Sequence, residues 1–466
     1  MAGLVWRVKL VAELRPGAET EVEVARIERG AEAGLAELGL RLDEAKRLTA
    51  ALQAQIVPAQ VAASGECHRS CTSCGRRLAS KGYYEARFRS LFGDVPVRVR
   101  RLLACRCQGP GGPKSVTTLA LGNGAAVAPE LAYVTARYAA IAPFSKAAAL
   151  LSELLPVSGA QHASTVRNRT QRVGTDVVQA HAAETANQPA AQATGPVVVG
   201  LDGGYVRSRH SEQGRHFEVI AGKVIDAGGA QHRFAFTRTG QAASTAAFRQ
   251  ALAAAGVNAE TPATVLCDGD AGLWRLQRTA LPGATVVLDW WHAAVRFEHA
   301  LKSARGLGTG TGTADTHSAQ EAVRGLERAK WRLWHGRWPG CRRKLAALHR
   351  WTRRKTKRDV AGIGRLQQHV AELLAYLERN EAELVPYAAR RRRGEAIATS
   401  FVESAVDEII AWRMTKAQQM RWSKMTVQPF LAVRTAVLND TLEDAFRRRH
   451  PGFRPANDDQ ALPAAA

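Results

Sequence analysis

The chain is poor in cysteine and has no long uninterrupted apolar run. A membrane-spanning helix needs roughly 18–20 consecutive apolar residues, and no stretch approaches that length. The first apolar stretch contains Arg7, Lys9 and Glu13, which excludes a secretory signal peptide. We therefore expect a cytoplasmic protein that makes no contact with a membrane.

Acidic residues are also scarce relative to basic ones. Aspartate and glutamate number 42 against 65 lysines and arginines, which leaves a formal net charge of +23. Like charges repel in the compact state, whereas a polyanion is attracted because its phosphates release counterions on binding. A ribosome-associated protein and a merely very soluble one are the alternatives. We expect nucleic acid as the partner, with the protein associated with the nucleoid.

Five of the seven cysteines fall in one short window, and the other two are isolated. An odd number clustered in this way indicates a reduced compartment and a metal site rather than a disulfide framework. Zinc takes four tetrahedral cysteine or histidine ligands. The predicted ligands of a structural zinc are Cys71, Cys74, Cys105 and Cys107.

This window predicts a zinc-ribbon-like module over residues 61–120. Its short strands would have too small a core to fold without metal. The single residue between Cys105 and Cys107 departs from the common spacing, so Cys67 and His68 are alternative ligands. Free reduced thiols are the alternative to zinc.

The remaining N-terminal elements are predicted from turn residues and apolar spacing. Residues 1–60 predict a hairpin followed by a helix that begins near Leu35. Residues 121–182 predict a helical DNA-binding region, in which 141–173 suits either a helix-turn-helix or an ordinary helical hairpin. A linker is expected over 183–196.

After the linker, strand and helix signals follow the order β-β-β-α-β-α-β-α. Three meandering strands followed by alternating units describe an α/β, RNase H-like catalytic core, a mixed sheet flanked by helices. The first part of this core is placed at 197–305 and an all-helical, basic insertion at 306–395. The core is completed at 396–450, and a disordered tail is expected over 451–466.

Two aspartates stand at the ends of strands in this core. Asp202 lies in a β-prone run, and Asp268 ends the run before Gly269. The first and fourth strands are neighbours in an RNase H-like sheet, so the two carboxylates would meet and repel, which a divalent cation resolves. Hard oxygen ligands favour Mg²⁺ (or Mn²⁺). Asp270 is the alternative to Asp268.

A third carboxylate is expected from the helix that begins near residue 401. Glu403 would complete a pair of ion sites about 3.5–4 Å apart, as in two-metal phosphoryl transfer. The alternative is a capping box, in which Glu403 merely bonds the backbone of Ser400.

Four sequence blocks resemble bacterial insertion-sequence transposases of the DDE class, closest to the ISKra group, over residues from about 30 to 450. The blocks are Val199-Gly-Leu-Asp-Gly-Gly, Leu266-Cys-Asp-Gly-Asp-Ala-Gly-Leu-Trp, Val287-Leu-Asp-Trp-Trp-His-Ala, and Phe401-Val-Glu-Ser-Ala-Val with the following Gln418-Gln-Met-Arg-Trp-Ser.

The resemblance implies roles for individual residues. Asp202, Asp268 and Glu403 match the three catalytic, metal-binding acids, and Asp289 and His292 match the Asp-x-x-His signature of related transposases. This pair would bind metal or the flanking DNA strand, or His292 would be a buried histidine that fixes a carboxylate.

Basic runs with interleaved tryptophans predict DNA contacts in the helical insertion. Tryptophans at three- and four-residue spacing suit either base stacking or the core of a helical subdomain. The residues predicted to contact phosphates are Arg353, Arg354, Lys355, Lys357, Arg390, Arg391, Arg392 and Arg393.

Together these features predict an enzyme that nicks the inverted-repeat ends of its own element and joins them to target DNA. By analogy it would act on double-stranded DNA as a homodimer or larger assembly. Two alternatives share part of the pattern: an RNase H-like, structure-specific nuclease of the resolvase type, and a catalytically inactive zinc-ribbon DNA-binding protein.

Overall fold

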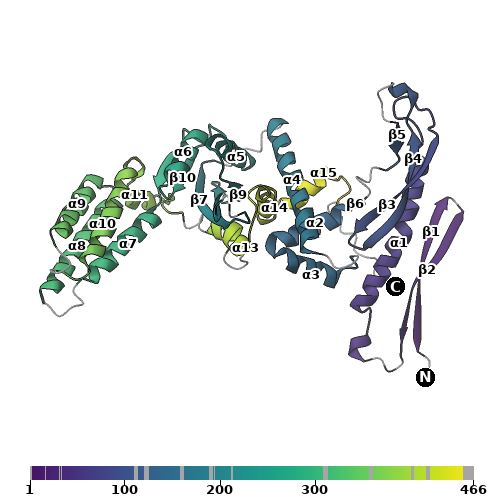
Figure 1. Cartoon of the computed structure of the whole chain (residues 1–466), viewed down its shortest axis with the longest axis horizontal. Helices are drawn as coiled ribbons and strands as arrows, with labels where there is room; N and C mark the ends of the chain where they lie inside the picture. The colour runs from purple at the N-terminus through teal and green to yellow at the C-terminus, as the bar shows by residue number, and fades with distance from the viewer. Residues whose placement is uncertain are drawn as a thin grey trace. The chain divides into compact units, whose positions relative to one another are not determined.

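The computed structural model of the chain separates into two compact units, Met1–Val173 with Thr441–Ala466, and Gly174–Asp440 (Figure 1). Within the described residues, no helix is both long and apolar enough to cross a membrane. The described residues are 3–15, 17–30, 32, 34–109, 114–119, 125–157, 162–187, 193, 195–210, 212, 214–307, 313–355, 360–399, 404–415 and 420–454.

The first unit begins with the predicted hairpin, β1 (Leu4–Arg15) and β2 (Ala18–Arg29). The predicted start of the next helix is wrong, because α1 runs from Leu42 to Cys67 and only a 3-10 turn forms at Leu35–Glu37. Gly39, with φ +70°, interrupts the backbone between them.

A four-stranded sheet with the order β5-β4-β3-β6 packs on α1. The strands are β3 (Ser80–Ser90), β4 (Gly93–Leu103), β5 (Ser115–Thr117) and β6 (Ala125–Val127). Val95, Val97 and Val99 alternate along β4 and are buried against Val57 and Val61 of α1. The prediction of short strands with little core is therefore wrong: β3 and β4 have 11 residues each and an apolar core of their own.

Besides α1, this unit contains α2 (Pro129–Ile141), α3 (Phe144–Leu154), α15 (Leu442–Arg449) and the first part of α4 (Ala163–Asn187). Contrary to the prediction, α4 continues into the expected linker, since that stretch is rich in helix-forming alanine. The prediction that residues 396–450 complete the core is wrong for α15, because this helix belongs to the first unit. There Phe446 packs edge-on against Tyr133 of α2.

The second unit is built on a five-stranded sheet with the order β11-β10-β7-β8-β9. β7, β8 and β9 are antiparallel, whereas β10 and β11 run parallel to β7. The predicted order of strands and helices is confirmed. The elements are β7 (Val197–Arg207), β8 (His216–Ile225), β9 (Gln231–Thr237), α5 (Gln241–Ala254), β10 (Ala263–Cys267), α6 (Ala271–Ala280), β11 (Thr285–Leu288) and α7 (Trp290–Arg305).

A helical module follows this sheet in the chain, and with α7 it forms the group of helices drawn in green in Figure 1. Its elements are α8 (Thr313–Trp334), α9 (Trp338–Arg354), α10 (Ile363–Arg379), η4 (Glu381–Glu383) and α11 (Tyr387–Arg392). The buried face of α10 carries apolar residues at three- and four-residue spacing: Leu366, Val370, Leu373 and Leu377. One continuous apolar core joins the sheet to this module.

The chain then returns to the sheet through η5 (Asp407–Ala411), which is π-helical, α13 (Trp412–Met414) and α14 (Val427–Leu438). The predicted helix from residue 401 is described from residue 404 onward. It packs so closely on β7 that a Cβ atom on Gly204 would lie 2.5 Å from Cδ1 of Ile410. Only glycine allows this approach.

Candidate active site and metal centre

Two of the predicted acids lie level with each other on neighbouring parallel strands. β10 pairs with β7 so that Leu266 stands opposite Gly200. Two residues further along both strands come Asp268 and Asp202. Because adjacent strands are about 4.8 Å apart, the two carboxylates share one edge of the sheet.

Asp289 joins them from the next strand. β11 pairs with β10 with Leu288 opposite Cys267, and the backbone N–H of Asp289 donates to the carbonyl oxygen of Cys267 at 3.0 Å. Asp202 thus lies within β7, which continues to Arg207, whereas Asp268 and Asp289 directly follow β10 and β11. The charges of Asp268 and Asp289 both raise the pKa of Asp202, so the three carboxylates lie in one region of the unit.

Asp202 is largely buried, and the backbone N–H of Gly203 donates to its Oδ1 at 2.7 Å. Burial, and then the charge of Asp268, raise the pKa of Asp202 to about 6. An ionised carboxylate in this position is thus unfavourable by itself and would be stabilised by a cation.

The loop that carries Asp268 is held by the helical module. The hydroxyl of Tyr376, in α10, donates to the carbonyl oxygen of Asp268 at 2.8 Å. Gly269 adopts φ +93°, and a Cβ atom there would lie 2.8 Å from Nδ2 of Asn380. The turn after β10 therefore requires glycine.

Asp270, the alternative ligand, is engaged elsewhere. It caps α6 by accepting from the backbone N–H groups of Gly272 and Leu273, both at 2.9 Å, and it forms an ion pair with Arg238 at 3.3 Å. Capping explains an aspartate at this position, so Asp268 is the better candidate ligand.

Asp289 and His292 form a pair at the start of α7. Asp289 is fully buried, and its Oδ1 accepts from the backbone N–H of Trp291 at 2.7 Å. Its Oδ2 accepts from the hydroxyl of Thr399 and lies 3.6 Å from Nε2 of His292, whose side chain is 25% exposed. Burial raises the pKa of Asp289. His292 is therefore oriented by a buried carboxylate while part of its ring faces outward.

Glu403 lies outside the described residues. The described part of the helix that follows it reaches the strand of Asp202, since Val406 and Ile410 pack against Gly204. Glu408 in the same segment forms an ion pair with Arg233 at 2.5 Å.

The four predicted cysteines of the first unit come together. Their Sγ atoms all lie within 4.8 Å of one another, with 3.6 Å between Cys71 and Cys107 and 3.5 Å between Cys74 and Cys105. Around a tetrahedral zinc with Zn–S bonds of about 2.3 Å, sulfur atoms are about 3.8 Å apart. The cluster could therefore hold a zinc ion.

The alternative zinc ligands take other positions. Cys67 ends α1 and is exposed, and Nδ1 of His68 lies 2.9 Å from the carbonyl oxygen of Ser64. Among the described residues, only the four predicted cysteines form a metal-binding group of this kind.

A local turn orients the first cysteine pair. The N–H of Gly75 donates to the carbonyl oxygen of Cys71 at 2.9 Å, and Gly75 adopts φ +70°. The backbone N–H groups of Cys74 and then Ser73 lower the pKa of the Cys71 thiol to about 6. The turn thus favours the thiolate that binds metal.

The predicted phosphate-contacting residues of the helical module differ in exposure. Arg353, Arg354 and Lys355 are exposed at the end of α9, and Lys357 lies outside the described residues. Arg391, Arg392 and Arg393 are exposed at the end of α11. Arg390 is buried, with Nε bonded to the carbonyl oxygen of Ala396 and Nη1 to Glu395 at 3.1 Å.

Most tryptophans of the helical module belong to its core. Trp334 stacks on Tyr387, with ring centroids 6.4 Å apart, and Trp338 is buried. Trp331 is 51% exposed, with the guanidinium of Arg337 5.2 Å from its ring centroid.

In α4, Arg169 of the predicted recognition helix is buried.

Sequence reasoning missed Thr399, which donates to the carboxylate of Asp289, and Tyr376, which donates to the backbone carbonyl of Asp268. It also missed Asn380, which bonds the side chain of Trp274 and the carbonyl oxygen of Tyr376. Comparison with known proteins assigns no family: no family model matches the chain, and no curated protein sequence matches it significantly.

Proposed function

We propose that the chain is a DNA transposase of the DDE type with an RNase H-like core. The observation that supports this most directly is that Asp202 and Asp268 stand level on adjacent parallel strands, β7 and β10. The strand order, with three antiparallel strands followed by two parallel ones, is the order expected of such a core.

The carboxylate edge fits a pair of Mg²⁺ (or Mn²⁺) ions in the chemistry of its donors. Asp202 and Asp268 would hold the ions, and Glu403 is the third ligand that the sequence indicates. Once bound, such ions activate a water or a 3′-hydroxyl and stabilise the leaving oxygen of a phosphodiester. The donors are hard oxygens, and two neighbouring carboxylates need positive charge to remain ionised together.

The residues around the edge would position the DNA strand. Asp289 and Thr399 fix the ring of His292, whose exposed part we expect to contact the strand beside the scissile phosphodiester. The cysteine cluster and the basic helical module would bind the inverted-repeat ends and the target, and the net charge of +23 supports a polyanionic partner. By analogy, we expect a homodimer or larger assembly on paired ends.

An assay of nicking and joining tests this proposal. The full-length protein is incubated with Mg²⁺, a target plasmid and a duplex made from the DNA that flanks its own coding region. We expect nicked 3′ ends and joined products, and Asp202→Asn should abolish both while DNA binding persists. Cleavage without joining would indicate a resolvase-type nuclease. DNA binding without cleavage, unaffected by Glu403→Gln, would indicate a non-catalytic DNA-binding protein.

A further inference from the structure

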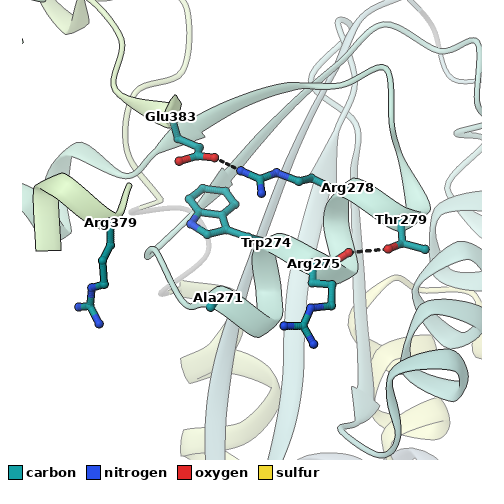
Figure 2. Close-up of a pocket in the computed structure, with 7 residues that line it drawn as sticks. All are labelled: Ala271, Trp274, Arg275, Arg278, Thr279, Arg379 and Glu383. Atoms are coloured by element: carbon teal, nitrogen blue, oxygen red, sulfur yellow. Dashed lines mark hydrogen bonds and ion pairs between the residues drawn. The ribbon is translucent and has the colours of Figure 1, made fainter. Parts of the chain in front are cut away.

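A pocket of about 380 Å³ opens between α6 and the end of α10 (Figure 2). It lies outside the carboxylate edge and outside the basic runs that the sequence indicated. Its main lining residues are Trp274, Arg275, Arg278, Thr279, Arg379 and Glu383.

The lining carries more positive than negative charge. Arg278 forms an ion pair with Glu383, whose side chain is 5% exposed, so these two charges balance. Arg275 and Arg379 are exposed, and neither side chain has an ion-pair or hydrogen-bond partner among the described residues. Figure 2 shows them on either side of Trp274, both directed away from the Arg278–Glu383 pair. Two guanidinium groups of the lining therefore have no carboxylate partner among the described residues.

Such an arrangement suits a phosphodiester backbone. Guanidinium groups bind phosphate oxygens through paired hydrogen bonds, and exposed arginines can reach a ligand that lies across the surface. The indole of Trp274 is buried and forms part of the apolar wall. The only carboxylate among the pocket's lining residues is that of Glu383, and it is paired with Arg278. The remaining arginines are therefore available to attract an anion.

The pocket is tied to the carboxylate edge by a chain of hydrogen bonds. Nε1 of Trp274 donates to Oδ1 of Asn380 at 2.7 Å, and Nδ2 of Asn380 donates to the carbonyl oxygen of Tyr376 at 2.8 Å. Tyr376 in turn holds the loop of Asp268. α6 begins three residues after Asp268 and, with 10 residues, is about 15 Å long. A strand bound in the pocket would thus be held at a set distance from the carboxylates.

We propose that this pocket binds the sugar–phosphate backbone of a DNA strand, with Arg275 and Arg379 contacting its phosphates. This inference rests on the proposed function for the identity of the polyanion. Arg278 and Glu383 shape the wall and do not bind DNA directly.

The salt dependence of DNA binding tests the pocket. Binding of a short duplex of unrelated sequence is measured by fluorescence anisotropy over a series of potassium chloride concentrations. Each phosphate contact contributes about −0.9 to the slope of log K against log salt, so Arg275→Gln with Arg379→Gln should make the negative slope shallower by about 2 and weaken binding. An unchanged slope overturns the proposal.

Matched variants separate a local contact from a general loss of charge. Arg26→Gln with Arg47→Gln removes two exposed arginines that are ion-paired to Glu28 and Asp43 in the first unit. This control should leave the slope unchanged, and an equal decrease in both double variants overturns the pocket. Circular dichroism verifies that each variant is folded.

Neutralising the carboxylate of the pocket gives a second readout, with the opposite expected effect on binding. Glu383→Gln removes the negative charge beside Arg278 and should tighten DNA binding, provided that circular dichroism shows a folded protein. Weaker binding by folded Glu383→Gln contradicts the proposal.

The two proposals fail separately. If Asp202→Asn abolishes joining while the arginine variant binds DNA like the wild type, only the pocket is refuted. If the arginines control DNA binding in a protein that never cuts or joins DNA, only the transposase is refuted.

Discussion

The two candidate metal sites are built in different ways. In the first unit, a local turn at Gly75 orients Cys71 and Cys74, and the four sulfur atoms are already spaced as around one ion. In the second unit, the carboxylate edge exists because β10 and β11 pair in parallel with β7. Tyr376 supports this edge from 108 residues away along the chain. The cysteine site depends on local structure, whereas the aspartate site depends on the pairing of distant strands. We therefore expect substitutions of the cysteines to lower the stability of the first unit, and substitutions of the aspartates to lower activity.

The largest expected effect is on catalysis. Under the proposed function, Asp202→Asn or Asp268→Asn should lower nicking and joining by roughly a thousandfold or more, because the ions that these carboxylates would hold would supply several kcal/mol of transition-state stabilisation. Rates are measured on the end-plus-target substrate described above. Each variant removes one of two repelling carboxylates, so its thermal midpoint in metal-free buffer should equal or exceed that of the wild type. A folded Asp202→Asn protein with wild-type activity would contradict the assignment.

The next effect is on stability. Cys105→Ser should lose zinc, measured by elemental analysis, and lower the unfolding midpoint of the first unit by roughly 10 °C, as a loss of several kcal/mol implies. The core of Val57, Val61 and the β4 valines should keep the sheet folded at room temperature. The matched control is Cys67→Ser, at the exposed cysteine that ends α1, and it should retain zinc. Full zinc content in Cys105→Ser would rule out this ligand set.

A smaller effect is expected from the residues that orient the carboxylate edge. Thr399→Val removes the hydroxyl that donates to Asp289, so His292 should lose its fixed orientation and nicking should fall about 10- to 100-fold. Thr352→Val provides a control, because Thr352 is a buried threonine of α9 whose hydroxyl bonds within its own helix. Equal losses in both variants would assign Thr399 a purely structural role.

The smallest effect concerns pH and the first unit. Hydrogen bonds from Arg29, and then from the backbone N–H of Arg41, lower the pKa of Glu44 from 4.5 to about 2. The lowered pKa means that the ionised carboxylate stabilises the fold above about pH 4.5, and that this contribution is lost as the pH falls toward 2. Glu44→Gln should therefore unfold at a lower temperature than the wild type at neutral pH, and the difference should disappear near pH 2. A difference that is independent of pH would contradict this explanation.

The comparison also shows what the sequence could predict. The set of four cysteines could be predicted because the two members of each pair are close in sequence and zinc coordination restricts their spacing. The sequence also predicted that the strands of Asp202 and Asp268 are neighbours, which the pairing of β10 with β7 confirms. The metal-binding role of the two aspartates, inferred from the cost of a charge at a strand position, stays a prediction. The strand order itself followed from β-prone runs and turns.

Other features had no local signal. Thr399, Tyr376 and Asn380 act through contacts more than a hundred residues away in the chain, which no spacing rule indicates. The pocket likewise depends on the packing of α6 against α10. By contrast, Val95, Val97 and Val99 alternate with Pro96, Arg98 and Arg100, and this period of two did signal a long strand in β4, which the short zinc-ribbon prediction overlooked.

The continuous apolar core that joins the five-stranded sheet to the helical module has a geometric consequence. Because the buried residues of the sheet and of the module belong to one cluster, we expect a DNA strand that is bound by the module and cut at the sheet to be held at a nearly constant distance from the carboxylates. Every cleaved end should then show protection from chemical attack at one constant offset, in base pairs, from the position of the nick.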